Sequence, residues 1–174
     1  MEITFRLAAE ADIPWLMNAY RNAIEYQQAV SSVYWLQPTR EEIAEMIAMR
    51  KMWIISLSGQ DIASFVLLSE DHAIWGDLEK GEAIYLHRIV TLIRGKLRIM
   101  PLLIEWALKL ARQKGRQYLR MDTWTDNQAL IDYYRSFGFK LLGHRRPAQP
   151  ELLPSYYSAI ELVLLELPVP QHFS

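Results

Sequence analysis

The most constraining feature of this sequence is a strand–helix–strand pattern in its second half. A β-rich run over Ala83–Thr91 is followed by a helical stretch over about Ile99–Lys114, which stops at Gly115, and then by a strand over Tyr118–Trp124. A crossover helix of this length allows two strands to pair in parallel within one sheet. The pattern therefore predicts a partly parallel sheet, and the core face of the helix is expected to contain Leu102, Leu103, Trp106, Leu110 and Ala111.

The other segments predict further strands and helices around this unit. Two β-rich runs flank Ser58-Gly59-Gln60-Asp61, which is typical of a hairpin, and Thr39-Arg40-Glu41-Glu42 is a capping-box pattern. We expect a strand over Ile3–Leu7, helices from Asp12 (as N-cap) to Gln28 and from Thr39 to Arg50, hairpin strands over Met52–Leu57 and Ile62–Ser69, a short helix from Asp126 or Asn127 to Gly138, and strands over Phe139–Leu142 and Ala159–Leu167.

These elements define the predicted fold class as α/β, with an α+β mixed sheet. Their order is βααβββαβαββ, and we expect a central mixed β-sheet with helices on both faces. The 174 residues are an ordinary length for one domain, so residues 1–174 are predicted to form a single domain.

Composition excludes several classes of protein. Lys and Arg number 19 and Asp and Glu number 20, a balance that argues against a nucleic-acid partner. The absence of cysteine excludes disulfides, thiolate zinc sites and Cys nucleophiles. Charges interrupt the apolar runs well short of the ~20 residues that span a membrane, and the first residues lack a signal-peptide layout. We therefore expect a cytoplasmic protein without a membrane partner.

A basic turn precedes the predicted helix at Ile99. The run Arg94-Gly95-Lys96 connects strand and helix, and Arg98 adds another positive charge. Unpaired N–H groups at a helix N-terminus attract anions, so this turn suits a phosphate or pyrophosphate. A solvated basic turn with no ligand is the alternative interpretation.

A second pattern follows the strand that ends at Trp124. A small or aliphatic residue lies three positions after an Asn, a Tyr lies seven positions after it, and Gly-Phe lies at positions eleven and twelve: Asn127, Leu130, Tyr134, Gly138 and Phe139. With this spacing, the upstream Arg94-Gly95 and the element order, the sequence resembles the GNAT superfamily of acyl-CoA N-acyltransferases over nearly its whole length.

The resemblance implies an acetyl-CoA-dependent N-acetyltransferase that acts on a primary amine of a small molecule or peptide. Tyr134 would protonate the departing thiolate or orient the thioester, and Tyr133 would be a bystander. The resemblance also implies a set of cofactor-binding residues. They are the backbone of Ile89, Val90 and Thr91 and Asn127 for pantetheine, with Tyr134 at the thioester and Arg94, Gly95, Lys96 and Arg98 at the pyrophosphate.

The sequence offers several candidates for the general base. His87 lies in the strand before the basic turn, and the unperturbed pKa of histidine, near ~6.5, suits a base at neutral pH. Glu82, Arg88 and Asp122 are further polar residues on the two strands, and a structural His87 with water as the proton carrier remains an alternative. No metal is expected.

The acceptor pocket is expected in two connections rich in aromatic residues. The first contains Tyr34 and Trp35, and the second contains Tyr156. This combination suits a small-molecule or peptide amine without identifying it. The oligomeric state stays open, with a homodimer as one alternative.

The glycine loop departs from the family pattern. Leu97 and Ile99 occupy the positions of the family's second and third glycines, which let backbone N–H groups approach the pyrophosphate. Arg98 can compensate through bidentate contacts to phosphate oxygens. The alternative function is a GNAT-fold regulatory or interaction module that binds acyl-CoA weakly or not at all.

Overall fold

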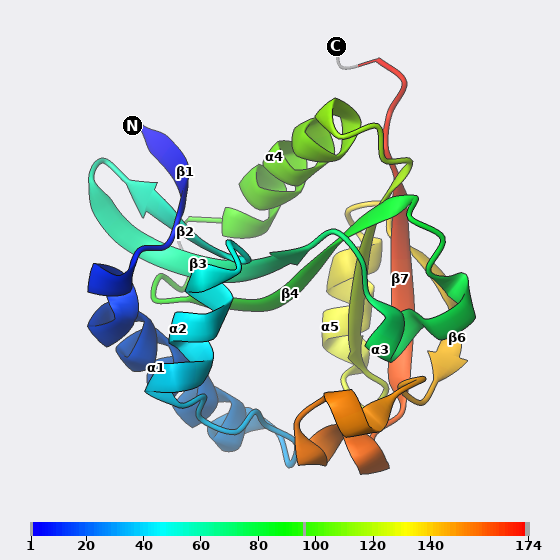
Figure 1. Cartoon of the computed structure of the whole chain (residues 1–174), viewed down its shortest axis with the longest axis horizontal. Coiled ribbons are helices and arrows are strands. Elements are labelled where there is room, and N and C mark those ends of the chain that lie inside the picture. Colours follow the sequence, from blue (N-terminus) through cyan, green and yellow to red (C-terminus); the bar gives the residue numbers. More distant parts are fainter. Residues whose placement is uncertain (1, 96, 173–174) are drawn as a thin grey trace. The chain divides into compact units, whose positions relative to one another are not determined.

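The strands and helices follow the predicted order along the chain (Figure 1). The computed structural model describes residues 2–95 and 97–172, except for the side chain of Tyr156. The strands of these residues are β1 (Ile3–Leu7), β2 (Met52–Leu57), β3 (Gln60–Leu68), β4 (Ala83–Thr91), β5 (Tyr118–Trp124), β6 (Lys140–Arg145) and β7 (Leu162–Pro168). Their α-helices are α1 (Ile13–Val30), α2 (Arg40–Ala48), α3 (His72–Trp75), α4 (Ile99–Gln113) and α5 (Gln128–Arg135).

The chain divides into two units. The first comprises residues 1–67 and 88–97, and the second comprises residues 68–87 and 98–174. Strand β4 contributes to both, because its residues 83–87 belong to the second unit and its residues 88–91 to the first. The single domain over residues 1–174 stays a prediction.

Antiparallel strands form the sheet of the first unit. Ile3 in β1 lies opposite Leu57 in β2, and β2 then turns back through Ser58 and Gly59 to pair with β3. Both turn residues have positive φ, +48° at Ser58 and +83° at Gly59. Glycine adopts this conformation without a Cβ clash, which is why the Ser-Gly pair suits the turn. The predicted hairpin is confirmed.

The two helices of the first unit begin differently. The predicted capping box starts α2, because Thr39 Oγ1 accepts the N–H of Glu42 at 3.1 Å and the Glu42 carboxylate accepts the N–H of Thr39 at 2.7 Å. A short 3₁₀ turn over Glu10–Asp12 precedes α1. Asp12 occupies the N-cap position of α1 but does not cap it with its side chain, because the carboxylate pairs with Arg6 at 2.7 Å instead.

The strands of the second unit follow the order β4-β5-β7-β6. β4 and β5 pair in parallel over Ala83–Tyr85 and Tyr118–Arg120, as the strand–helix–strand pattern predicts. β7 lies between β5 and β6 and is antiparallel to both (Figure 1, β7 in red). Parallel and antiparallel pairs therefore occur in one sheet, which makes it mixed.

The buried face of α4 differs by one position from the predicted face. Leu103, Ala107 and Ala111 have no exposed surface, whereas Leu102 and Trp106 are half-buried. The spacing of four residues places the two alanines and Leu103 on one stripe. Alanine side chains let the helix backbone lie close to its neighbours, and the larger Leu102 and Trp106 then lie at the margin of the stripe.

A short helix that was not predicted from the sequence lies between β3 and β4. α3 covers His72–Trp75 and continues into a 3₁₀ turn over Gly76–Leu78. Trp75 is fully buried, and its ring contacts Tyr85 with 5.5 Å between ring centroids. This helix was not predicted from the sequence, because four residues are too few to show helical periodicity.

A buried arginine connects several segments of the second unit. The side chain of Arg120 is 4% exposed and pairs with Glu82 at 2.9 Å and Glu166 at 2.8 Å. It also donates hydrogen bonds of 3.0 Å to the carbonyl of Leu78 and to the hydroxyl of Tyr85. A guanidinium is stable in such a place only when charges and acceptors compensate for lost hydration.

The predicted fold class is confirmed. The observed order is βααβββαβαββ with α3 as an addition, and the chain combines helices with a mixed sheet. None of the helices in the described residues has both the length and the apolarity that a membrane crossing requires.

Candidate active site

Side chains of β4 and β5 meet just beyond the last parallel pair of the two strands. Tyr85 lies opposite Arg120, and His87 and Asp122 follow two positions later on each strand. Successive side chains of a strand alternate between faces, so His87 and Asp122 are on the same face as Tyr85 and Arg120. The Nδ1 atom of His87 lies 3.3 Å from the Oδ1 atom of Asp122.

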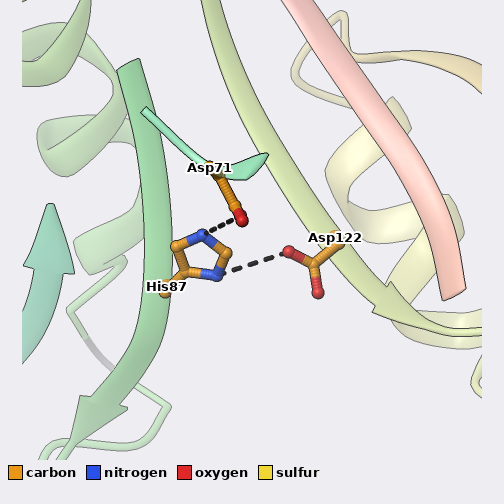
Figure 2. Close-up of side chains that lie close together, drawn as sticks. All are labelled: Asp71, His87 and Asp122. Atoms are coloured by element: carbon orange, nitrogen blue, oxygen red, sulfur yellow. Dashed lines mark ion pairs between the residues drawn. The ribbon is translucent and has the colours of Figure 1, made fainter. Parts of the chain in front are cut away.

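A second carboxylate reaches His87 from the segment before α3. The Oδ2 atom of Asp71 lies 2.9 Å from Nε2 of His87, so each ring nitrogen has its own carboxylate (Figure 2). The side chains of Asp71, His87 and Asp122 are 4%, 13% and 6% exposed. We call these three residues the Asp–His–Asp cluster.

The position of Asp71 is set by local hydrogen bonds. Its Oδ1 atom caps α3 by accepting the N–H of Ile74 at 3.1 Å, which leaves Oδ2 for His87. Its backbone N–H donates to the Glu79 carboxylate at 2.9 Å. Sequence analysis did not identify Asp71. The sequence around Asp71 shows only a possible helix-capping residue with Ile74 and Trp75 after it. This pattern does not indicate a contact with His87, which lies sixteen positions later.

Burial changes the ionisation of Asp122. Loss of hydration raises the pKa of Asp122 to about 6; the positive charge of His87 acts in the opposite direction, and the charge of Asp71 adds to the rise. A carboxyl group with this pKa can gain and lose a proton near neutral pH. The cluster therefore contains a group suited to acid–base chemistry.

The cluster contains enough potential ligands for a cation site. One potential ligand atom from each of the three residues lies within 4.8 Å of the others, and no other group of described residues meets this criterion. However, the two ring nitrogens of His87 face different carboxylates. A metal ion can bind only one nitrogen of an imidazole, so this arrangement fits a histidine cation between two anions better than three converging ligands.

Tyr134 lies on α5, close enough to Asp122 to be affected by its charge. Burial raises the pKa of Tyr134, and interactions with Tyr133 and with the carboxylate of Asp122 raise it further, so the phenol is protonated at neutral pH. Its ring packs edge-on against Phe139, with 6.3 Å between centroids. Asn127 is the N-cap of α5, and its side chain accepts the N–H of Leu130 at 3.1 Å.

The predicted pyrophosphate loop begins in the first unit. Gly95 has φ of +97°, a conformation that favours glycine, and a Cβ there would meet no atom within 4 Å. Arg94 is exposed, and its guanidinium lies 3.9 Å above the ring of Tyr26. Lys96 lies outside the described residues. Arg98 belongs to the second unit, where it is exposed at the N-cap position of α4.

The backbone of β4 is irregular next to the cluster. Arg88, which follows His87 directly, has φ of +49°, although it is not a glycine. A positive φ costs a residue with a Cβ on the order of 1 kcal/mol, and such strain is often found at functional sites. Ile89, Val90 and Thr91 come next, and the Thr91 hydroxyl accepts the N–H of Ile93 at 3.2 Å.

The predicted acceptor residues are described only in part. Tyr34 is exposed in the first unit, and Trp35 packs there against Tyr20, with 6.3 Å between ring centroids. The side chain of Tyr156 lies outside the described part of the chain. The structure thus brings together His87, Asp122 and Tyr134 within one unit and adds Asp71 to them.

Comparison with known proteins identifies the fold. No family model and no curated protein matches the sequence. A GNAT-family acetyltransferase structure from Listeria monocytogenes is similar, with a TM-score of 0.75 and 19% identity over 97% of this chain and 95% of that chain. An N-acetyltransferase structure from Staphylococcus aureus has a TM-score of 0.67 and 18% identity over 98% and 100%.

A third similar structure is yncA from Salmonella typhimurium, solved with its cofactor acetyl-CoA. It has a TM-score of 0.64 and 14% identity over 99% of this chain and 96% of that chain. The similarity to each of the three structures extends over nearly the whole length of this chain. This chain therefore has the fold of the GNAT-family acetyltransferases.

Proposed function

We propose that this protein is an acetyl-CoA-dependent N-acetyltransferase that acts on a primary amine of a small molecule or peptide. The observation that carries the proposal is the Asp–His–Asp cluster, in which His87 faces Asp71 at 2.9 Å and Asp122 at 3.3 Å. The phenol of Tyr134 lies close enough to Asp122 to be influenced by its charge. Acyl transfer from a thioester to an amine requires an acid that protonates the departing thiolate and a base that takes up a proton from the amine. Tyr134 can serve as the acid, and the cluster can supply the base. The fold supports the same activity, since a similar structure contains acetyl-CoA.

The proposed chemistry assigns a role to each group. The neutral amine nitrogen attacks the thioester carbonyl carbon, a C–N bond forms, and the C–S bond breaks. Tyr134 donates its hydroxyl proton to the departing thiolate, and the pair formed by His87 and Asp122 takes up the proton that the amine loses. One proton is given and one is received, so the overall reaction needs no other reactant.

The proposed cofactor site uses backbone and charged groups. The N-terminus of α4 and a positive-φ glycine suit a pyrophosphate, because N–H groups there can point at phosphate oxygens. The groups proposed to bind the cofactor are the backbone of Ile89, Val90 and Thr91, the side chains of Arg94, Lys96, Arg98, Asn127 and Tyr134, and Gly95. Tyr34, Trp35 and Tyr156 are proposed to contact the acceptor.

The proposal is tested by binding first and turnover second. Calorimetric titration with acetyl-CoA is expected to show saturable binding, and a panel of amines is then screened for release of free CoA. Tyr134→Phe is the matched variant: it keeps the ring and removes only the hydroxyl proposed as the acid, so it should still bind acetyl-CoA and release little CoA. A folded sample that binds no acetyl-CoA at millimolar concentration would falsify the proposal.

One observation favours a second candidate, a GNAT-fold module that binds acyl-CoA weakly or not at all. Ile99, which occupies the position of a family glycine, is 7% exposed and is the first residue of α4. A buried side chain within the helix therefore lies where the family has a glycine. Leu97, at the other glycine position, is half-buried. Side chains at these two positions restrict how closely the backbone can approach a phosphate. The same titration separates the two candidates.

A further inference from the structure

The Asp–His–Asp cluster has a geometry that distinguishes the roles of its members. Both ring nitrogens of His87 face a carboxylate oxygen, at 2.9 Å for Asp71 and 3.3 Å for Asp122 (Figure 2). A nitrogen lone pair facing either oxygen would be repelled, so the doubly protonated imidazolium is the form that fits. Neither contact has the alignment of a hydrogen bond, since Asp71 Oδ2 and Asp122 Oδ1 accept none, and the attraction is therefore mainly between charges.

An imidazolium has no lone pair with which to accept a proton. Asp122 differs, because only its Oδ1 atom faces His87 and Figure 2 shows its second oxygen directed away from the ring. Both carboxylate oxygens of Asp71 already have a contact, since Oδ1 caps α3 and Oδ2 faces His87. Asp122 is thus the member of the cluster with an oxygen available for proton transfer.

The neighbouring cation of β5 is paired outside the cluster. Arg120, on the same face of β5 as Asp122, is paired with Glu82 and Glu166 and bonded to the Tyr85 hydroxyl. The Glu79 carboxylate accepts the backbone N–H of Asp71, and the phenol of Tyr134 on α5 is close enough to Asp122 to be influenced by its charge. His87 is therefore the cation that contacts Asp122.

Resting on the proposed function, we infer that His87, held by Asp71, is a positioning residue that keeps Asp122 ionised, and that Asp122 accepts the proton of the acceptor amine. In this step the N–H bond of the attacking amine breaks and an O–H bond forms on Asp122. The electron pair stays on nitrogen as the amide forms. The proton then passes from Asp122 to the Tyr134 phenolate left after thiolate protonation, which restores both groups.

The electrostatics of Asp122 support this division of roles. Burial and Asp71 raise the pKa of Asp122, and His87 lowers it, with a result of about 6. Removal of the His87 charge should therefore raise the pKa of Asp122 further. A neighbouring opposite charge typically shifts a pKa by about 1–3 units, which sets the scale of the effect.

The first experiment is a ¹³C NMR titration of the Asp122 carboxyl group, which does not depend on turnover. We expect a midpoint near 6 in the unmodified protein and a midpoint about 1–3 units higher in His87→Gln. The matched control is His72→Gln, because His72 is exposed and follows Asp71 directly. His72→Gln should leave the midpoint unchanged. A His87→Gln midpoint equal to that of the unmodified protein would overturn the positioning role.

The second experiment measures kcat against pH with an amine that is acetylated. The unmodified protein should lose activity below about pH 6, and His87→Gln should lose it at a higher pH that matches its NMR midpoint. Asp122→Asn should reduce kcat about 10²–10⁴-fold and leave acetyl-CoA affinity, measured by calorimetry, nearly unchanged. His87→Asn is a second variant at the same site if the glutamine variant does not fold.

Two results separate the failure of this inference from the failure of the proposed function. If His87→Gln abolishes kcat at every pH while Asp122→Asn keeps it, His87 is itself the base and our inference is wrong although the enzyme acetylates amines. If the unmodified protein acetylates no amine, the proposed function is wrong and the role of Asp122 as base is wrong with it. The NMR titration still decides in that case whether His87 controls the charge of Asp122.

Discussion

The hydroxyl of Tyr134 can be separated experimentally from the ring that carries it. The ring packs against Phe139 and Tyr133, with 6.3 and 6.0 Å between centroids, so Tyr134→Phe keeps these contacts. If the hydroxyl protonates the thiolate, its loss affects only the transition state. We predict that Tyr134→Phe lowers kcat about 10²–10⁴-fold with little change in KM, measured by CoA release.

Tyr133 provides the control for this variant. It lies next to Tyr134 on α5, and its ring is edge-on to Phe137 at 4.9 Å. Tyr133→Phe should keep most of the activity, because the proposed acid is Tyr134, which lies seven positions after Asn127, and not Tyr133. Near-full kcat in Tyr134→Phe, or a larger loss in Tyr133→Phe, would contradict the assignment and leave Tyr134 as a packing residue.

Arg94 can likewise be tested alone, because it is exposed and its guanidinium stacks on Tyr26. We predict that Arg94→Ala weakens binding of CoA by about 1.5–3 kcal/mol but hardly changes binding of pantetheine, which has no pyrophosphate. Calorimetry with both ligands measures the difference. Arg40→Ala, an exposed arginine at the start of α2, is the control. Equal losses for the two ligands would mean that the pyrophosphate binds elsewhere.

At the scale of elements, α2 depends on the capping box at its N-terminus. Thr39 and Glu42 exchange two hydrogen bonds, and α2 has only nine residues, so the loss of one bond affects much of the helix. We predict that Thr39→Ala lowers the free energy of unfolding by about 0.5–2 kcal/mol, measured by urea denaturation. The exposed Ser32→Ala should change it by much less, and an equal effect of both would contradict a capping role.

Elements whose signals are local were predicted well from the sequence. The capping box of Thr39 and Glu42 involves residues three positions apart, and the Ser58-Gly59 turn is recognisable from two residues. α3 was missed because four residues give no periodicity, although its Trp75 is fully buried. The length of an element therefore limited what its sequence could reveal.

The cluster could not be predicted because its members meet through strand register. Asp71 and His87 are sixteen positions apart, and Asp122 lies thirty-five positions after His87. They meet because Tyr85 pairs with Arg120, which places the residues two positions later side by side, and because α3 orients Asp71. His87 and Tyr134 were candidates from the sequence, whereas Asp71 required the structure.

For the molecule as a whole, Asp122 makes stability depend on pH. Its pKa in the fold is about 6, above the usual 3.8, so the fold favours the protonated form. The resulting contribution to stability is present at about pH 4 and is lost as the pH rises through 6. A shift of this size corresponds to at most about 3 kcal/mol.

We therefore predict that the unmodified protein loses stability relative to Asp122→Asn, by up to about 3 kcal/mol, between pH 4 and 7. Urea denaturation of both proteins at each pH measures the difference. The carboxyl groups of Asp12 and Glu79 have lowered pKa values and act in the opposite direction, but they do so equally in both proteins. A difference that stays constant over this pH range would contradict the prediction.

The buried arginine of the second unit has a consequence for how that unit opens. Arg120 bonds to Tyr85 in β4, to Glu166 in β7 and to Glu82 and Leu78 before β4. If any one of these segments detached alone, the guanidinium of Arg120 would stay buried but lose one of the partners that compensate for its lost hydration. Partial opening is thus penalised more than complete opening. Slow amide hydrogen exchange in β4, β5 and β7 should then report one shared cooperative event rather than strand-by-strand fraying.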